Sequence, residues 1–266
     1  MADSITITKN LTTPQMALLH QLDELEIVLF NIDTLPSLLA EPFDNLNELV
    51  ENLTHKHFLL RIERGKYCRS TFRDENVIGT FLVEDGVIAY WSALNLHGLT
   101  EQFGNTIYVQ CLKRKPTKQF LGTSYSFVTI NQQKKGGVMY NGYGNYKYAI
   151  TDIEKTIVDC FDLPRYSGGY AELIRAFKKA ELNADKLIRY CKMVDNCAII
   201  KRMGYLASLL EKGSLVPFTE YALTKVNAAY NLFDPSSADV GTFNSQWRLR
   251  LNISEQEILD IVQKQY

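Results

Sequence analysis

Hydrophobic residues near the start of the chain recur at the spacing of a helix. After Thr13 and Pro14, leucine or methionine returns every three or four residues. This predicts a helix with proline in its first turn, where the missing N–H group costs no hydrogen bond. The short apolar run at 27–30 predicts a brief strand, and the pattern at 34–40 predicts a second, shorter helix.

The following segment completes the N-terminal pattern. Apolar positions at 46–53 repeat with helical spacing, and Asn45 with Glu48 three residues later is an approximate capping box. The runs at 58–62 and 66–70 are strand-like and are separated by a tight turn, which predicts a hairpin. Helix, strand, two helices and a hairpin are the order of a winged helix-turn-helix.

The rest of the chain predicts a second domain of mixed α and β structure. The polar stretch between Arg73 and Gly79 places the boundary, so we expect a winged helix-turn-helix domain at 1–76 and a larger domain at 77–266. Expected strands are 106–111, 125–130 and 138–150, and expected helices are 88–96, 151–161, 171–179, 184–193 and 198–210. After residue 210 only a weak helix at 254–263 is predicted, and the role of 211–266 stays open. The fold class is therefore α+β.

Charge is distributed unevenly along the chain, although the formal net charge is only −1. The first 51 residues contain nine acids and one base, whereas residues 56–73 contain six bases and one acid. Residues 106–148 contain seven bases and no acid. Either basic block can meet a polyanion while the whole chain stays near neutral, although each can equally balance acidic residues folded beside it.

The winged-helix order predicts contacts with DNA. A recognition helix presents side chains to base edges, and the wing lays basic residues against phosphates. Glu48 and Glu51, on the same expected helix, repel phosphate unless they accept hydrogen bonds from cytosine or face away. The expected DNA-binding residues are Asn47, Asn52, Thr54, Lys56, Arg61, Arg64, Lys66 and Arg69 in the first domain and Lys113, Arg114, Lys115 and Lys118 in the second.

Composition narrows the class of protein further. Apolar residues make up 46% and charged residues 22% of the chain, which is ordinary globular usage. No apolar run is long enough to span a bilayer, and MADSITITKN at the start predicts no secretory signal. Five dispersed cysteines without a C-x-x-C pair favour reduced thiols in the cytoplasm. We expect no catalytic residue, metal ligand or cofactor.

Two blocks of the sequence resemble a known family. The stretch AYWSALNLHGLTEQ at 89–102 is similar to the signature of the AbiEi-like antitoxins of type IV toxin–antitoxin systems. The block at 149–159, with Glu154 and Lys155, and the wing at 61–67 resemble the same family. The likeness covers about 13–210.

The resemblance implies a function as well as a fold. An N-terminal winged helix would bind double-stranded operator DNA and repress its own operon, and the larger domain would carry antitoxin activity. The functional partner would be a nucleotidyltransferase-like toxin, and the biological setting would be phage defence. Whether the toxin is contacted directly, and whether the protein is a monomer or a dimer, stay open.

Two other functions are alternatives. One is a winged-helix adaptor that neutralises a protein partner without binding DNA. The other is a metal-dependent nucleotidyltransferase, because Gly136 and Gly137 followed by Asp152 and Glu154 resemble a glycine pair and two metal-binding carboxylates. These carboxylates fall at an expected helix start, where they suit the helix dipole, and His97 is expected to be a structural histidine.

Overall fold

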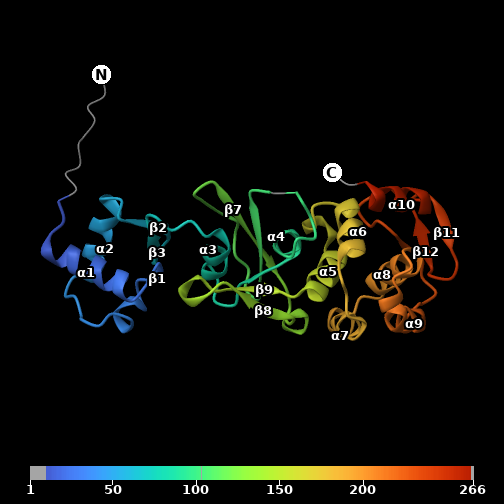
Figure 1. Cartoon of the computed structure of the whole chain (residues 1–266), viewed down its shortest axis with the longest axis horizontal. Helices are drawn as coiled ribbons and strands as arrows, with labels where there is room; N and C mark the ends of the chain where they lie inside the picture. Colours follow the sequence, from blue (N-terminus) through green and yellow to red (C-terminus); the bar gives the residue numbers. More distant parts are fainter. Residues whose placement is uncertain (1–9, 103, 265–266) are drawn as a thin grey trace, which may run out of the picture. The chain divides into compact units, whose positions relative to one another are not determined.

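The computed structural model describes residues 10–102 and 104–264, and it has the α+β architecture that the sequence predicts (Figure 1). Two compact units divide the chain. One comprises the chain up to Leu82 together with Gly142–Lys147, and the other comprises Val83–Asn141 and the chain from Tyr148 onward. Residues 1–9, on which the prediction about a secretory signal rests, lie outside the described range. Within that range, no helix is long and apolar enough to cross a membrane.

The first unit combines α-helices with a small antiparallel sheet. Its elements are α1 (Thr13–Glu24), β1 (Leu29–Asn31), the 3-10 turn η1 (Leu35–Ser37), α2 (Leu46–His55), β2 (Leu59–Glu63), β3 (Lys66–Arg69) and α3 (Glu75–Phe81). Strand β3 lies between β1 and β2 and pairs antiparallel with both. Leu18 of α1, Phe30 of β1, and Val50 and Leu53 of α2 are buried together in one hydrophobic core cluster. The apolar positions that recur in the sequence are therefore the ones that this core buries.

Two local expectations for this unit were wrong. The helix expected at 34–40 is only the turn η1, since it buries a single side chain, Leu35, which gives a longer helix little to pack against. Asn45 precedes α2, but its side chain makes no capping hydrogen bond. The polar stretch at the expected boundary forms much of α3, whose N-cap Asp74 accepts hydrogen bonds from the backbone N–H groups of the next turn.

A six-stranded mixed sheet opens the second unit. Its strands are β4 (Val87–Ile88), β5 (Thr106–Cys111), β6 (Lys118–Phe120), β7 (Thr123–Thr129), β8 (Val138–Asn141) and β9 (Tyr148–Thr151), in the order β6-β7-β5-β4-β9-β8. Strand β4 pairs parallel with β9 and antiparallel with β5. The strand-like segment expected at 138–150, with a turn signal at Asn141 and Gly142, is two antiparallel strands of a hairpin, and Gly142 and Gly144 both take positive φ between them.

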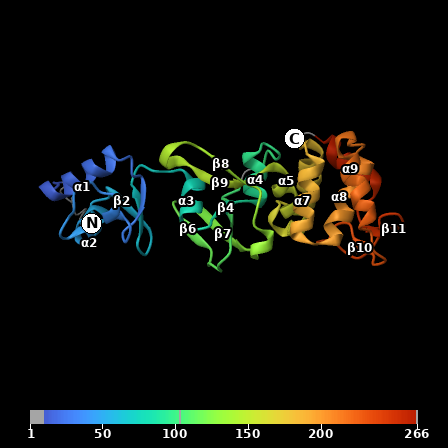
Figure 2. The ribbon, with the colours of Figure 1, turned by 90° about the horizontal axis from the view of Figure 1, so that it is seen from below.

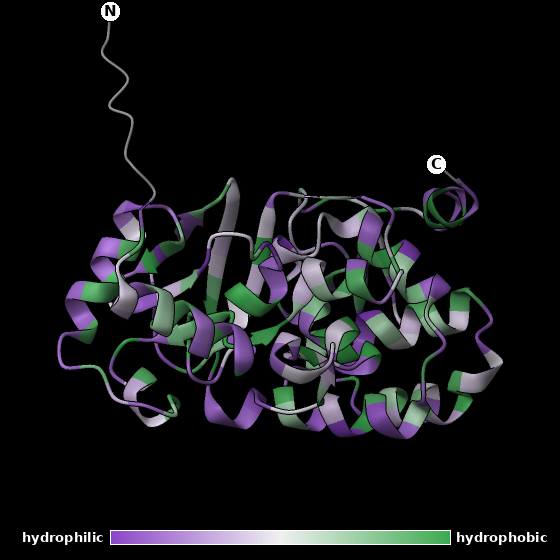
Figure 3. Cartoon of the chain, turned by 60° about the vertical axis from the view of Figure 1, so that its left-hand side comes forward, coloured by the Kyte–Doolittle hydropathy of each residue, from purple (hydrophilic) through white to green (hydrophobic). Residues whose placement is uncertain are grey.

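Helices fill the remainder of the second unit. They are α4 (Tyr90–Leu96), α5 (Ile153–Asp162), α6 (Tyr170–Lys179), α7 (Ala184–Val194) and α8 (Cys197–Leu209), close to the ranges that the sequence predicts. Both views of the chain place α5, α7 and α8 in one group (Figures 1 and 2). Several helices of the chain carry hydrophobic and hydrophilic residues on different sides (Figure 3). The apolar sides of the helices in this unit share one large core, which includes Phe161, Phe177 and Met203.

Residues 211–264 are more ordered than the sequence predicts. They form α9 (Val216–Thr224), a small sheet of β10 (Asn231–Leu232), β11 (Thr242–Asn244) and β12 (Leu249–Leu251), and α10 (Glu255–Gln263), which is the one helix that was expected there. Two buried cations of α8 hold this segment. Lys201 Nζ lies 2.6 Å from the carbonyl oxygen of Ala229, and Arg202 Nε lies 2.9 Å from that of Leu232. Trp247 packs against Gly204 of the same helix, so this segment is part of the core.

Candidate nucleic-acid interface

The turn between β2 and β3 is the expected wing of the first unit. Gly65 has a φ of +78°, which lets the chain reverse tightly. Arg64 is exposed at this turn and makes no hydrogen bond or ion pair with residues in the described part of the chain. Arg61 on β2 is also exposed, and its guanidinium lies 3.6 Å from the carboxylate of Glu51 on α2. These two arginines present their charge to solvent.

Three other expected phosphate contacts are bound within the unit. Lys66 Nζ lies 2.7 Å from the carbonyl oxygen of Leu82, the C-cap residue of α3. Lys56 Nζ lies 2.8 Å from Oε1 of Gln15, and Arg69 Nη2 lies 2.7 Å from the carboxylate of Asp23. A phosphate would have to compete with these partners. Their contact with DNA stays a prediction, and the structure favours the two exposed arginines over them.

Helix α2 offers a mixed face for reading bases. Asn47 is exposed, whereas Asn52 and Thr54 are half-buried, and the Thr54 hydroxyl donates a hydrogen bond within its own helix. Glu48 and Glu51 are both exposed on this helix. Asn47 is therefore the most accessible of the expected base contacts, and it lies beside a carboxylate.

The basic residues expected to contact DNA from the second unit surround the start of β6. Lys113 and Arg114 are exposed in the loop after β5, and Lys118 is half-buried on β6. Lys115 Nζ lies 5.6 Å from the centroid of the Phe127 ring, at cation–π distance. Thus the four residues do not share one environment.

Two further cations belong with this group and were missed by the sequence analysis. Lys134 and Arg165 line a cleft of about 600 Å³ together with Arg114 and Lys115. Lys134 belongs to the acid-free block 106–148, which was a usable signal. Arg165 carried no signal, because its position depends on how the turn η4 (Pro164–Tyr166) packs beside β7.

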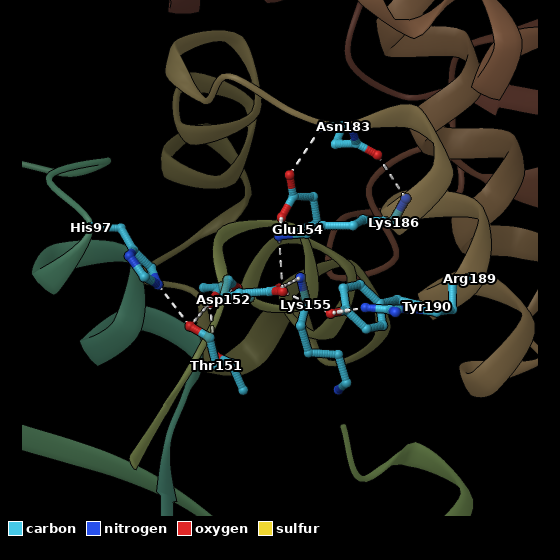
Figure 4. A network of polar contacts seen from close by, with 10 residues as sticks. His97, Thr151, Asp152, Glu154, Lys155, Asn183, Lys186, Arg189 and Tyr190 are labelled. Carbon is cyan, nitrogen blue, oxygen red and sulfur yellow. Dashed lines mark hydrogen bonds and ion pairs between the residues drawn. The ribbon is translucent and has the colours of Figure 1, made fainter. Parts of the chain in front are cut away.

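The two blocks that resemble the antitoxin family meet at the start of α5 (Figure 4). His97, which follows α4, lies with Nε2 2.7 Å from the carbonyl oxygen of Thr151 on β9. Asp152 is the N-cap of α5, because its side chain accepts a hydrogen bond from the backbone N–H of Lys155. The hydroxyl of Tyr190 on α7 donates to the other carboxylate oxygen of Asp152 at 2.7 Å. These polar residues connect α4, β9, α5 and α7.

The carboxylates considered for metal binding contact a lysine instead. Lys186 Nζ lies 3.3 Å from Asp152 and 3.1 Å from Glu154, and hydrogen bonding to Glu154 raises the pKa of the Lys186 ammonium (Figure 4). Both carboxylates are thus paired with the same ammonium group. The described residues also contain no group of three His, Cys, Asp or Glu suited to a metal. A Cβ on Gly137 would lie 2.6 Å from Cβ of Lys155, so that glycine permits close packing on α5.

A buried ion pair continues along α5. Lys155 is fully buried and its ammonium hydrogen-bonds the carboxylate of Asp159 one turn later. Gln110 Nε2 donates to the second oxygen of Asp159 at 2.6 Å. Burial raises the pKa of the Asp159 carboxyl, and the neighbouring Lys155 opposes that change. The pair is closed off from solvent, which indicates a structural function.

The protein is therefore an α+β protein of two units. The smaller unit consists of helices and a three-stranded sheet with a hairpin, and the larger one contains the polar contacts that connect α4, β9, α5 and α7. No protein-family model matches the sequence, and none of the curated proteins matches it. Among solved structures, the RV2827C protein from Mycobacterium tuberculosis is similar, with a TM-score of 0.66. The sequences are 13% identical, and the match covers 96% of each chain. The likeness therefore shows a shared fold along nearly the whole chain.

Proposed function

We propose that this protein is a DNA-binding regulator that represses its own operon and serves as the antitoxin of a type IV toxin–antitoxin system. The observation that carries the proposal is the first unit, in which α2 is followed directly by the β2–β3 hairpin and the strand order is β1-β3-β2. Winged helices present a recognition helix and a following hairpin to DNA, and here α2 and β2–β3 are the proposed counterparts, with the turn η1 in place of the helix expected before α2. The exposed Arg64 at the hairpin turn supports it.

Arg64 and Arg61 are the proposed phosphate contacts of the wing. Each arginine that neutralises a phosphate releases a counterion, so binding weakens steeply as salt rises. Such contacts fix the position of the protein on the duplex, and base recognition falls to exposed residues of α2 such as Asn47.

Replacing Arg64 with alanine is expected to weaken binding to every duplex similarly and to lower the salt slope by about one unit. Its side chain is exposed and makes no hydrogen bond or ion pair in the described structure, so stability should change little. The measurement is fluorescence anisotropy with duplex DNA from the region upstream of the gene and with a scrambled duplex, at two salt concentrations about fourfold apart.

Lys225→Ala is the matched control, because Lys225 is exposed at the end of α9, where it contacts Tyr221. It should leave the affinity and the salt slope as they are. If wild-type protein binds neither duplex at low salt, the proposal of DNA binding is wrong. If it binds and Arg64→Ala behaves like the control, the wing does not take part.

Antitoxin activity is proposed to reside in the second unit and to be separable from DNA binding. The double variant Arg61→Ala/Arg64→Ala should therefore lose repression of a reporter while it still protects cells that express the neighbouring toxin gene. Both substitutions lie on the exposed hairpin of the first unit. Loss of protection at unchanged protein levels would contradict this division of labour.

The acidic face of α2 favours a second candidate, an adaptor that binds a basic protein surface. Replacing Glu48 with glutamine distinguishes the two functions, because Glu48 is exposed in the first turn of α2. If α2 enters the major groove, the substitution should tighten DNA binding by about threefold, within the 0.2–1 kcal/mol typical of an exposed charge interaction. Unchanged DNA affinity would show that α2 stays outside the groove, whereas no DNA binding by the wild type would favour the adaptor, and competition anisotropy measures both.

A further inference from the structure

A cleft in the second unit gathers positive charge from segments far apart in the sequence. It has a volume of about 600 Å³, which lies within the range of small-molecule sites. The loop after β5 contributes Arg114 and Lys115, the turn η2 (Gln132–Lys134) contributes Lys134, and η4 contributes Arg165. None of the described residues that line it is acidic.

The two arginines of the cleft have unused hydrogen-bond donors. Neither Arg114 nor Arg165 makes a hydrogen bond or ion pair with a residue of the described chain, and both are exposed. The guanidinium carbon of Arg165 lies 4.7 Å from the centroid of the Tyr166 ring. That ring packs in turn on the buried Tyr90 and on Tyr108, with centroids 5.3 and 5.5 Å away. The arginine is therefore held over a fixed surface.

The two lysines are less free than the arginines. Lys134 forms an ion pair with Asp162, whose side chain is only 7% exposed, and Lys115 lies over the ring of Phe127. Asp162 offsets one positive charge, so the cleft retains an excess of positive charge. Guanidinium groups bind phosphate oxygens through paired N–H donors, which makes clustered phosphates the anions that fit best.

We propose that this cleft binds a small ligand that carries adjacent phosphate groups, such as the polyphosphate chain of a nucleoside triphosphate. The concave shape favours a compact anion over the backbone of a duplex, whose phosphates are spread along a convex surface. Phe127 and Tyr166 add aromatic surface beside the cations. The proposal is independent of DNA binding by the first unit.

Isothermal titration calorimetry of the full chain tests it, with ATP, inorganic triphosphate and adenosine as probes at low salt. Both ATP and triphosphate should bind, and adenosine should not. The dissociation constant should rise about tenfold in Arg165→Ala and about tenfold in Arg114→Ala, since each loses one guanidinium contact with phosphate. Both side chains are exposed, so both variants should fold, and circular dichroism checks this.

Lys225→Ala again serves as the control and should bind the probes like the wild type. The proposal is overturned if neither ATP nor triphosphate binds at millimolar concentration, or if adenosine binds as tightly as ATP. It is also overturned if the arginine variants bind the probes as the control does. If those variants weaken the binding of duplex DNA and the wild type binds no ATP, the cleft is a contact for the DNA backbone instead.

Discussion

Lys155→Met is expected to lower the free energy of unfolding by about 3–5 kcal/mol, because it removes one partner of a buried ion pair. The carboxylate of Asp159 would stay buried, with Gln110 as its remaining hydrogen-bond donor. Urea denaturation followed by far-UV circular dichroism measures the change. The matched control is Lys186→Met, whose ammonium is bound to Asp152 and Glu154 but whose side chain is 44% exposed, and it should cost less than about 1 kcal/mol.

The loss should depend on pH in a defined direction. Burial raises the pKa of Asp159, so the folded state of the variant binds a proton more readily than the unfolded state does. Stability of Lys155→Met should thus fall as pH rises from the ordinary aspartate pKa through the raised one, and the gap to wild type should narrow in acid. Asp159→Asn in the same chain should restore much of the stability, since no buried charge would remain. Equal stability of Lys155→Met and Lys186→Met at neutral pH would contradict the importance of the buried pair.

Trp247→Ala is expected to cost about 3–5 kcal/mol, the usual range for a buried tryptophan. Trp247 is only 2% exposed, and a Cβ on Gly204 would lie 2.4 Å from its ring, so the indole fills the space beside α8. The substitution would leave a cavity between α8 and the segment that contains β10–β12. The shift in the midpoint of urea denaturation reports the loss.

Phe243→Ala provides the comparison on the same small sheet. Phe243 is 62% exposed on β11, so its removal should change stability by less than about 1 kcal/mol. If Trp247→Ala proves as mild as Phe243→Ala, residues 211–264 do not belong to the core of the second unit. If Trp247→Ala is much more destabilising than Phe243→Ala, the segment after α8 contributes to the core, and a chain truncated after α8 should be less stable.

Sequence periodicity predicted elements whose signal is local. Strand β5 (Thr106–Cys111) alternates in side-chain type over its first residues. Helix α10 (Glu255–Gln263) has Ser254 as its N-cap, whose side chain accepts a hydrogen bond from the backbone N–H of Glu257. The helix at 34–40 was wrong, because a longer helix there needed tertiary packing that the pattern did not reveal. The segment 138–150 is two strands joined at the turn that its glycines signal. Strands β10 and β12 were missed, since two or three residues cannot show an alternating pattern and are defined by their pairing.

The candidate sites divide in the same way. The sequence located the basic blocks. It also predicted a helix start at Asp152 and a structural histidine at His97, and Figure 4 shows Asp152 capping α5 and His97 bound to the backbone of Thr151. It did not separate Arg64, which makes no hydrogen bond or ion pair among residues 10–102 and 104–264, from Lys66, whose ammonium is bound to backbone carbonyls of the chain. Nor did it bring Arg165 beside Arg114.

The sequence by itself determined the α+β class, most helices of the second unit and the segregation of charge, because periodicity and composition are properties of neighbouring residues. Only the tertiary structure decided which cations are available to a ligand and that the segment after α8 completes the core. Those outcomes depend on hydrogen bonds and packing between residues far apart in the chain, whose free energies no local pattern encodes.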